Sequence, residues 1–120
     1  MVSYIAHCRS DYYQYDKRVF VDKRLPGMEY AQAGILYEPA AEFLISYETI
    51  VAEISADGWI HIYCIPSRST AKHIGKWGKL HNVDYFFLKD LYLRNREYNI
   101  YTLEYRDAVP GMIRTIGVAV

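Results

Sequence analysis

The chain has 120 residues, of which 52% are hydrophobic and 23% charged, and its 14 basic residues balance 14 acidic ones. This length predicts a single domain, residues 1–120, that can bury a core without disulfides or metals. A formal net charge of zero excludes a protein that coats nucleic acid through charge alone, because such binding depends on many neutralised phosphates.

The first forty residues contain sequence patterns typical of strands, of a turn and of a short helix. Val2–Cys8 and Arg18–Asp22 have the β-branched and aromatic character of short strands. The Leu-Pro-Gly sequence at 25–27 predicts a turn. Residues 28–36 are expected to form a short helix or irregular cover, and Pro39 ends whatever precedes it.

A β-hairpin is predicted between residues 42 and 65. Glu42–Ile54 is rich in β-branched and aromatic residues, Ser-Ala-Asp-Gly at 55–58 forms a turn, and Trp59–Ile65 is the returning strand. A three-residue loop with Gly58 in the left-handed conformation places aliphatic residues opposite one another. The expected pairs are Ile54 with Ile60, Ala52 with Ile62 and Ile50 with Cys64, and the other face carries Val51, Glu53, Trp59, His61 and Tyr63.

A helix is predicted to follow Pro66. Ser67 or Ser69 is its expected N-cap, and it ends near Lys79. Its two glycines weaken it by roughly 1 kcal/mol each relative to Ala, so packing must hold it. Gly78 is a candidate for the C-terminal cap. The expected core side consists of Ala71, Ile74 and Trp77, at helical spacing.

A second helix and a C-terminal hairpin complete the predicted elements. Asn82 or Asp84 caps the helix. Tyr98–Arg106 and Met112–Val120 are expected strands, joined by a Val-Pro-Gly turn at 109–111. The helix is expected to bury Tyr85, Leu88, Leu91 and Tyr92 and to expose Lys89, Asp90 and Arg94.

This order of elements predicts the fold class. Strands, two helices and further strands are typical of an α+β domain rather than of alternating βαβ units. We therefore expect a small antiparallel sheet, made from two hairpins, with two central helices. A hairpin-plus-helix unit at 46–80 forms its core.

The first helix carries the most unusual charge pattern of the chain. Four cations follow one another at steps of four, four and three, which places them on one face: Arg68, Lys72, Lys76 and Lys79. Residues 67–81 contain these four cations and no acid, so the remainder of the neutral chain sums to minus four. With Trp59 and Tyr63 of the hairpin, they are candidates to bind phosphates or an acidic protein surface. The alternative is a solvated helix face whose cations pair with carboxylates elsewhere in the fold.

One group of residues is a candidate for acid/base chemistry. Glu53 lies nearly opposite His61, and His73 can approach them from the helix. Structural histidines are the favoured interpretation, with His73 packing back over the hairpin as a clasp. No catalytic residue is therefore assigned.

Motifs for cofactors and metals are absent from the sequence. The glycines at 75 and 78 do not lie between a strand and a helix start, as a phosphate-binding loop requires. Cys8 and Cys64 match no metal-ligand spacing, and we expect reduced thiols. We expect neither a cofactor nor a metal.

Two short motifs resemble a known family. Ser-Tyr-Glu-Thr-Ile-Val-Ala at 46–52 is followed by Ser-Thr-Ala-Lys-His-Ile at 69–74. These are similar to an S-Y-x-T-x-V-A strand and a T-T-x-[KR]-H-[IV] helix start in short uncharacterised proteins of phages and mobile elements of gut bacteria. Ser69 stands where that family often has threonine. The resemblance implies a small phage or mobile-element accessory protein.

Three functions follow as hypotheses. The first is binding to a host or phage macromolecule, as an inhibitor of a bacterial defence system in the manner of an anti-CRISPR protein. The second is a nucleic-acid-binding accessory protein that uses the basic helix 67–80. The third is a small enzyme using Glu53, His61 and His73. We expect no signal peptide, no membrane span and a cytoplasmic location, and the C-terminal strand is a candidate edge for a homodimer.

Overall fold

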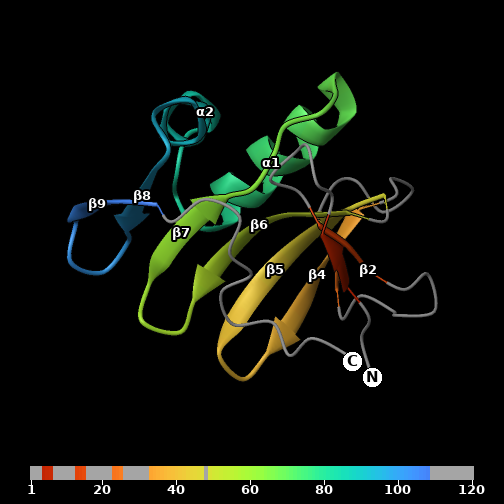
Figure 1. Cartoon of the computed structure of the whole chain (residues 1–120), viewed down its shortest axis with the longest axis horizontal. Coiled ribbons are helices and arrows are strands. Elements are labelled where there is room, and N and C mark those ends of the chain that lie inside the picture. The colour runs from red at the N-terminus through yellow and green to blue at the C-terminus, as the bar shows by residue number, and fades with distance from the viewer. Residues whose placement is uncertain (1–3, 7–12, 16–22, 26–32, 48, 109–120) are drawn as a thin grey trace.

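The computed structural model describes residues 4–6, 13–15, 23–25, 33–47 and 49–108. Its strands pair into one antiparallel sheet, and both helices pack on the same face of it (Figure 1). This confirms the predicted α+β class. The elements are β1 (Tyr4–Ala6), β2 (Tyr13–Tyr15), β3 (Lys23–Arg24), β4 (Ala33–Glu38), β5 (Ala41–Ser46), β6 (Thr49–Ser55), β7 (Trp59–Ile62), α1 (Arg68–Leu80), α2 (Tyr85–Arg94), β8 (Arg96–Asn99) and β9 (Tyr105–Asp107).

The sheet is mainly a meander of strands that follow one another in the chain. Its order is β3-β4-β5-β6-β7-β8-β9, while β2 pairs with both β1 and β6. Helices α1 and α2 are inserted between β7 and β8, which are nevertheless hydrogen-bonded neighbours. Both helices therefore belong to one connection between neighbouring strands. In this connection α1 packs on β5 and β6, and α2 packs on β7 and β8.

The β6–β7 hairpin has the predicted register. Ala52 pairs with Ile62 and Ile54 with Ile60, and Gly58 has a φ of +100°. The Gly58 amide donates to the Ser55 carbonyl over 2.9 Å, which closes the turn. A side chain at position 58 is also excluded by space, because a Cβ there would lie 2.5 Å from Cδ2 of Tyr101.

The predicted long strand Glu42–Ile54 is wrong. The chain turns at Tyr47, which has a φ of 59°, so this segment forms the β5–β6 hairpin. A register shift between Leu44 and Ile45 also disturbs the alternation of β6. As a result Val51, expected on the polar face, belongs to the hydrophobic core.

Other boundaries differ from the prediction at both ends of the described chain. Residues 28–36, expected to form a short helix or irregular cover, belong over their described part to strand β4. The expected strand Tyr98–Arg106 is instead two strands, β8 and β9, with a turn in which Leu103 has a φ of 63°. The expected strands Arg18–Asp22 and Met112–Val120 lie outside the described residues, as does Cys8.

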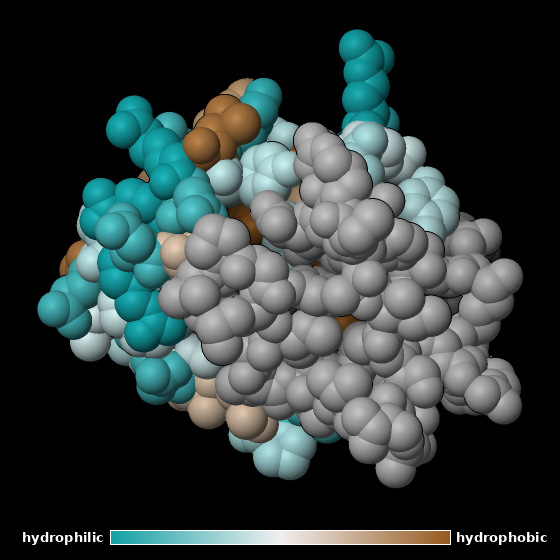
Figure 2. All heavy atoms as spheres, in the orientation of Figure 1, coloured by the Kyte–Doolittle hydropathy of each residue, from teal (hydrophilic) through white to brown (hydrophobic). Residues whose placement is uncertain are grey.

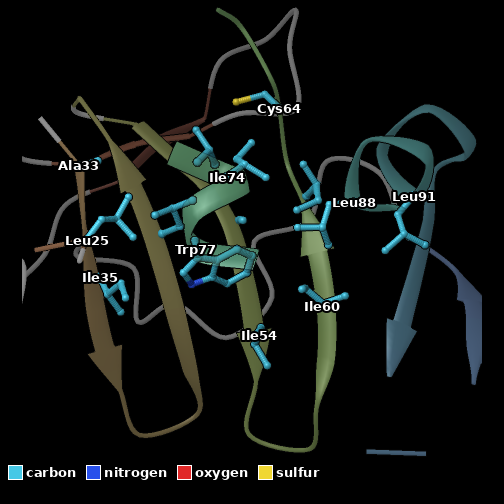
Figure 3. Packing of buried hydrophobic residues seen from close by; sticks show 14 residues of the cluster. Leu25, Ala33, Ile35, Ile54, Ile60, Cys64, Ile74, Trp77, Leu88 and Leu91 are labelled. Carbon is cyan, nitrogen blue, oxygen red and sulfur yellow. The ribbon is translucent and has the colours of Figure 1, made fainter. Parts of the chain in front are cut away.

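The core lies between the sheet and the two helices (Figure 3). Trp77 of α1 is fully buried and lies across the sheet, and its Nε1 donates to a Glu42 carboxylate oxygen over 2.7 Å. His81 contacts the same oxygen at 2.7 Å, which ties the end of α1 to β5. The core includes Ala52, Ile54, Ile60 and Ile62 from the sheet, Cys64 after it, and Ile74, Leu88 and Leu91 from the helices.

The helix ends follow local capping chemistry. Ser67 caps α1, as predicted, by accepting a hydrogen bond from the Thr70 amide, and Asp84 caps α2 in the same way. Gly78, however, is not the C-terminal cap, since α1 continues to Leu80 and His81 takes that position. Neither described helix is long and apolar enough to cross a bilayer.

Candidate functional site

The basic face of α1, defined as Arg68, Lys72, Lys76 and Lys79, is the first feature of the candidate site. All four side chains are exposed, while Thr70, His73, Ile74 and Trp77 form the buried side of the helix. Within the described part of the chain, no carboxylate lies within ion-pair distance of any of these four cations. The described structure therefore lacks the internal ion pairs that the alternative interpretation of this face requires.

A groove separates α1 from the start of α2, and we call it the α1–α2 groove. Its volume is about 370 Å³. Gly75 adds no side chain to the groove, and an added Cβ there would lie 3.6 Å from Cβ of Tyr85, in ordinary van der Waals contact. The groove is lined by Ala71, Lys72, Gly75, Lys76 and Lys79 of α1 and by Asp84 and Tyr85. Ala71, expected in the core, is half-buried here.

Helix α2 exposes hydrophobic side chains. Phe86 is 73% exposed and Leu93 69% exposed, and the Phe86 ring lies 5.5 Å from that of Tyr85, centroid to centroid. Hydrophobic side chains are visible at the surface over α2, among hydrophilic ones (Figure 2). Leu88 and Leu91 are buried as predicted, whereas Tyr92 is partly exposed. This helix thus presents apolar surface on more than one side.

His73 has the structural role that the sequence suggested. Its Nδ1 lies 2.8 Å from Oγ of Ser46, which also lies 3.0 Å from Oγ1 of Thr70, and all three residues are buried. Burial lowers the pKa of His73, because desolvation disfavours the charged imidazolium. The contact joins α1 to the end of β5, so His73 is a clasp between helix and sheet.

A buried polar cluster occupies the sheet face opposite the helices. Glu53 and His61 are cross-strand neighbours, and the Tyr63 hydroxyl donates a hydrogen bond to the Glu53 carboxylate. His61 Nδ1 lies 3.1 Å from a Glu97 carboxylate oxygen, and Arg106 donates to the other oxygen over 2.6 Å. These contacts connect β6, β7, β8 and β9 and need no ligand to explain them.

The predicted binding surface is therefore divided between two faces of the sheet. The basic residues lie on α1, but Trp59 and Tyr63 point to the opposite face, because they alternate with residues that pack under the helices. Tyr63 is only 1% exposed and cannot contact a partner. Trp59 is half-buried, with the Arg106 guanidinium 4.0 Å from its ring centroid. We therefore remove both aromatic residues from the candidate site.

The same division separates the predicted acid/base cluster. Glu53 and His61 share one face, but His73 is on α1, on the other face, where it contacts Ser46. The three residues do not form a catalytic group. Among the described residues, no three His, Cys, Asp or Glu side chains are grouped so that they could hold a metal ion.

Comparison with known proteins places the chain in a family. A model of a family of unknown function, DUF8033, matches residues 13–87. The chain belongs to the DUF8033 family. The matched DUF8033 region contains both motifs quoted above, at 46–52 and 69–74, and the whole of α1 with the groove as far as Tyr85. No curated protein and no solved structure matches the chain significantly.

The residues that sequence reasoning missed are those that build the groove from α2. The sequence pattern places Tyr85 in the core stripe of α2 and assigns no role to Phe86 or Leu93. Their separation by seven residues places them on one face of α2, away from the stripe of Leu88 and Leu91. That spacing was the available signal, because apolar residues outside a buried stripe remain at the surface.

Proposed function

We propose that this DUF8033 protein acts by binding an acidic macromolecule through the basic face of α1. It would serve as a small phage or mobile-element accessory protein in the host cytoplasm, inhibiting a bacterial defence protein in the manner of an anti-CRISPR. The observation that carries the proposal is the set of four exposed cations without ion-pair partners in the described part of the chain.

Charge complementarity is the physical basis of this proposal. Exposed lysines that are not engaged inside the protein can pair with carboxylates or phosphates of a partner without first breaking internal contacts. Such complementarity raises association rates and selects partners more than it adds affinity. Since the rest of the chain sums to minus four, an acidic partner is attracted to α1 and repelled elsewhere.

A pair of double variants with equal net charge tests the proposal. Lys72→Glu with Lys76→Glu reverses the basic face, whereas Lys89→Glu with Arg94→Glu gives the same net charge through exposed residues of α2 and also removes the Arg94–Asp90 ion pair of 2.9 Å. Proteins are captured from a lysate of the bacterial host with each variant. We expect the first double variant to lose partners that the second retains. An unchanged partner set would remove the basic face from the function.

Nucleic-acid binding is the second candidate, because the same cations are available to phosphates. It predicts that binding to duplex or single-stranded DNA falls steeply with salt, and that each lost cation weakens binding about equally for any sequence. Binding is measured at two salt concentrations for the wild type and for Lys72→Glu with Lys76→Glu. No binding at the lower concentration would reject this candidate.

A further inference from the structure

We propose that the α1–α2 groove receives a hydrophobic side chain from an acidic peptide segment of the partner protein. This inference rests on the proposed function and adds to it the class of partner and the position of its anchor. Three observations support the inference: the apolar lining of the groove, the cations at its rim and the exposed apolar side chains of the two helices.

The lining of the groove includes apolar residues. Ala71 and Gly75 contribute to it from α1, and Tyr85 from the start of α2. We call this part of the groove its floor. The groove volume of about 370 Å³ falls within the range of about 300–1,000 Å³ that is typical of ligand sites. The aliphatic stems of the lysines extend the apolar lining while their ammonium groups remain in water. Such a site fits an aromatic or aliphatic side chain.

The rim of the groove is positive. Lys72, Lys76 and Lys79 line it, and Asp84 is the one acid among its lining residues. The Asp84 carboxylate already accepts a hydrogen bond from the Phe86 amide over 2.9 Å, as the cap of α2. Three cations around an apolar floor complement a segment in which carboxylates flank a hydrophobic residue.

The exposed apolar side chains of the two helices favour a protein over a nucleic acid. Phe86 and Leu93 are largely exposed on α2, and Leu80 is exposed at the end of α1. Protein interfaces combine an aromatic and aliphatic centre with a charged rim. A phosphate backbone would gain little from these apolar side chains.

An NMR titration with a defined probe tests the inference. The probe is a nonapeptide of alternating Glu and Asp with one central Trp, and the matched control peptide has Ala in place of Trp. We expect amide shifts to concentrate at Ala71, Gly75 and Tyr85. The Ala peptide should bind about tenfold more weakly, because it lacks the anchor. Equal binding of the two peptides, or shifts that avoid the groove, would overturn the inference.

Substitution of Gly75 provides an independent measurement. Gly75→Leu fills the groove without altering charge and should abolish the preference for the Trp peptide, whereas Thr102→Leu, an equally neutral change in the exposed β8–β9 turn and outside the groove, should retain it. Unfolding curves confirm that each variant is folded. A Trp preference that survives in folded Gly75→Leu would refute the groove as the anchor site.

Three outcomes separate this inference from the proposed function. If Gly75→Leu captures the same host proteins as the wild type while Lys72→Glu with Lys76→Glu loses them, the groove fails and the basic face stands. If reversal of the basic face changes neither peptide binding nor capture, both proposals fail. If single-stranded DNA displaces the Trp peptide and binds more tightly, the partner is a nucleic acid and the inference is wrong.

Discussion

At the scale of single residues, His73 couples stability to pH. Its pKa lies below the ordinary value of 6.5 because the ring is buried, so the unfolded chain binds more protons than the folded one just below that pH. The stabilising effect of the neutral imidazole is full above pH 6.5 and declines as the pH falls toward the lowered pKa.

His73→Asn keeps a hydrogen-bonding group near Ser46 but cannot titrate. We therefore expect its free energy of unfolding to depend less on pH than that of the wild type. Urea unfolding at about pH 7.5 and about pH 5.5 measures the free energy of unfolding of both proteins. The wild type should lose more free energy of unfolding than the variant over this interval. Equal losses would mean that His73 is not a source of the pH dependence.

Ser46 supplies a second prediction at this scale. Ser46→Ala removes the group that contacts both His73 and Thr70 inside the protein. A buried polar group that loses its partner costs about 1–3 kcal/mol, so we expect a loss of that size in urea unfolding at neutral pH. Ser67→Ala is the comparison, since loss of the α1 cap costs about 1 kcal/mol. A Ser46→Ala variant as stable as the wild type would contradict the clasp.

Single residues also show why the sequence predicted one turn and missed another. Gly58 follows Asp57 between aliphatic strands, and glycine readily adopts the positive φ that the turn needs. Tyr47 adopts a φ of 59° without any such signal, because the fold imposes it. Alternation predicts the face on which Tyr63 lies, but it does not indicate whether that face is covered, and Tyr63 is buried.

At the scale of elements, the two glycines of α1 have opposite roles. A Cβ at Gly78 would lie 2.6 Å from the Val83 carbonyl oxygen and 2.8 Å from Cδ1 of Leu88, so this glycine lets α1 approach the following segment. A Cβ at Gly75 would make ordinary contacts with Tyr85. The sequence does not distinguish the two glycines, because the space available for a Cβ depends on how closely the two helices pack.

The matched pair Gly75→Ala and Gly78→Ala tests this distinction. Gly75→Ala should raise the free energy of unfolding by up to about 1 kcal/mol, because Ala favours helix and nothing clashes. Gly78→Ala should lower it by about 1–3 kcal/mol, because the backbone at Val83 must shift. Thermal or urea unfolding measures both. The packing of α1 against α2 would need revision if the two changes had the same sign.

Elements also show what could be predicted of the candidate site. The Ser67 cap and the charge spacing gave the position and the exposed face of α1. The groove could not be predicted, because it depends on the distance between α1 and α2. The sequence predicts one binding surface from α1 and the aromatic side of the β6–β7 hairpin, and this prediction is wrong. Since the aliphatic face of the hairpin packs under the helix, its aromatic residues must point away from α1.

At the scale of the whole molecule, charge is separated although it sums to zero. Residues 67–81 carry plus four and the remainder minus four. An acidic partner should therefore be steered toward α1, and its association rate should fall as salt screens the attraction, with a Debye length of about 8 Å at physiological ionic strength. Net charge alone hides this property, whereas the placement of charge on the fold reveals it.

Stopped-flow association with the acidic Trp peptide tests steering. Lys72→Glu with Lys76→Glu should slow association on the order of tenfold at about 20 mM salt, and the difference should shrink at about 200 mM. Lys89→Glu with Arg94→Glu has the same net charge but keeps the basic face of α1, so its association should slow much less. If both double variants slowed association equally, net charge rather than its placement would govern encounter. A slower rate confined to the first variant requires that the partner approach from the α1 side.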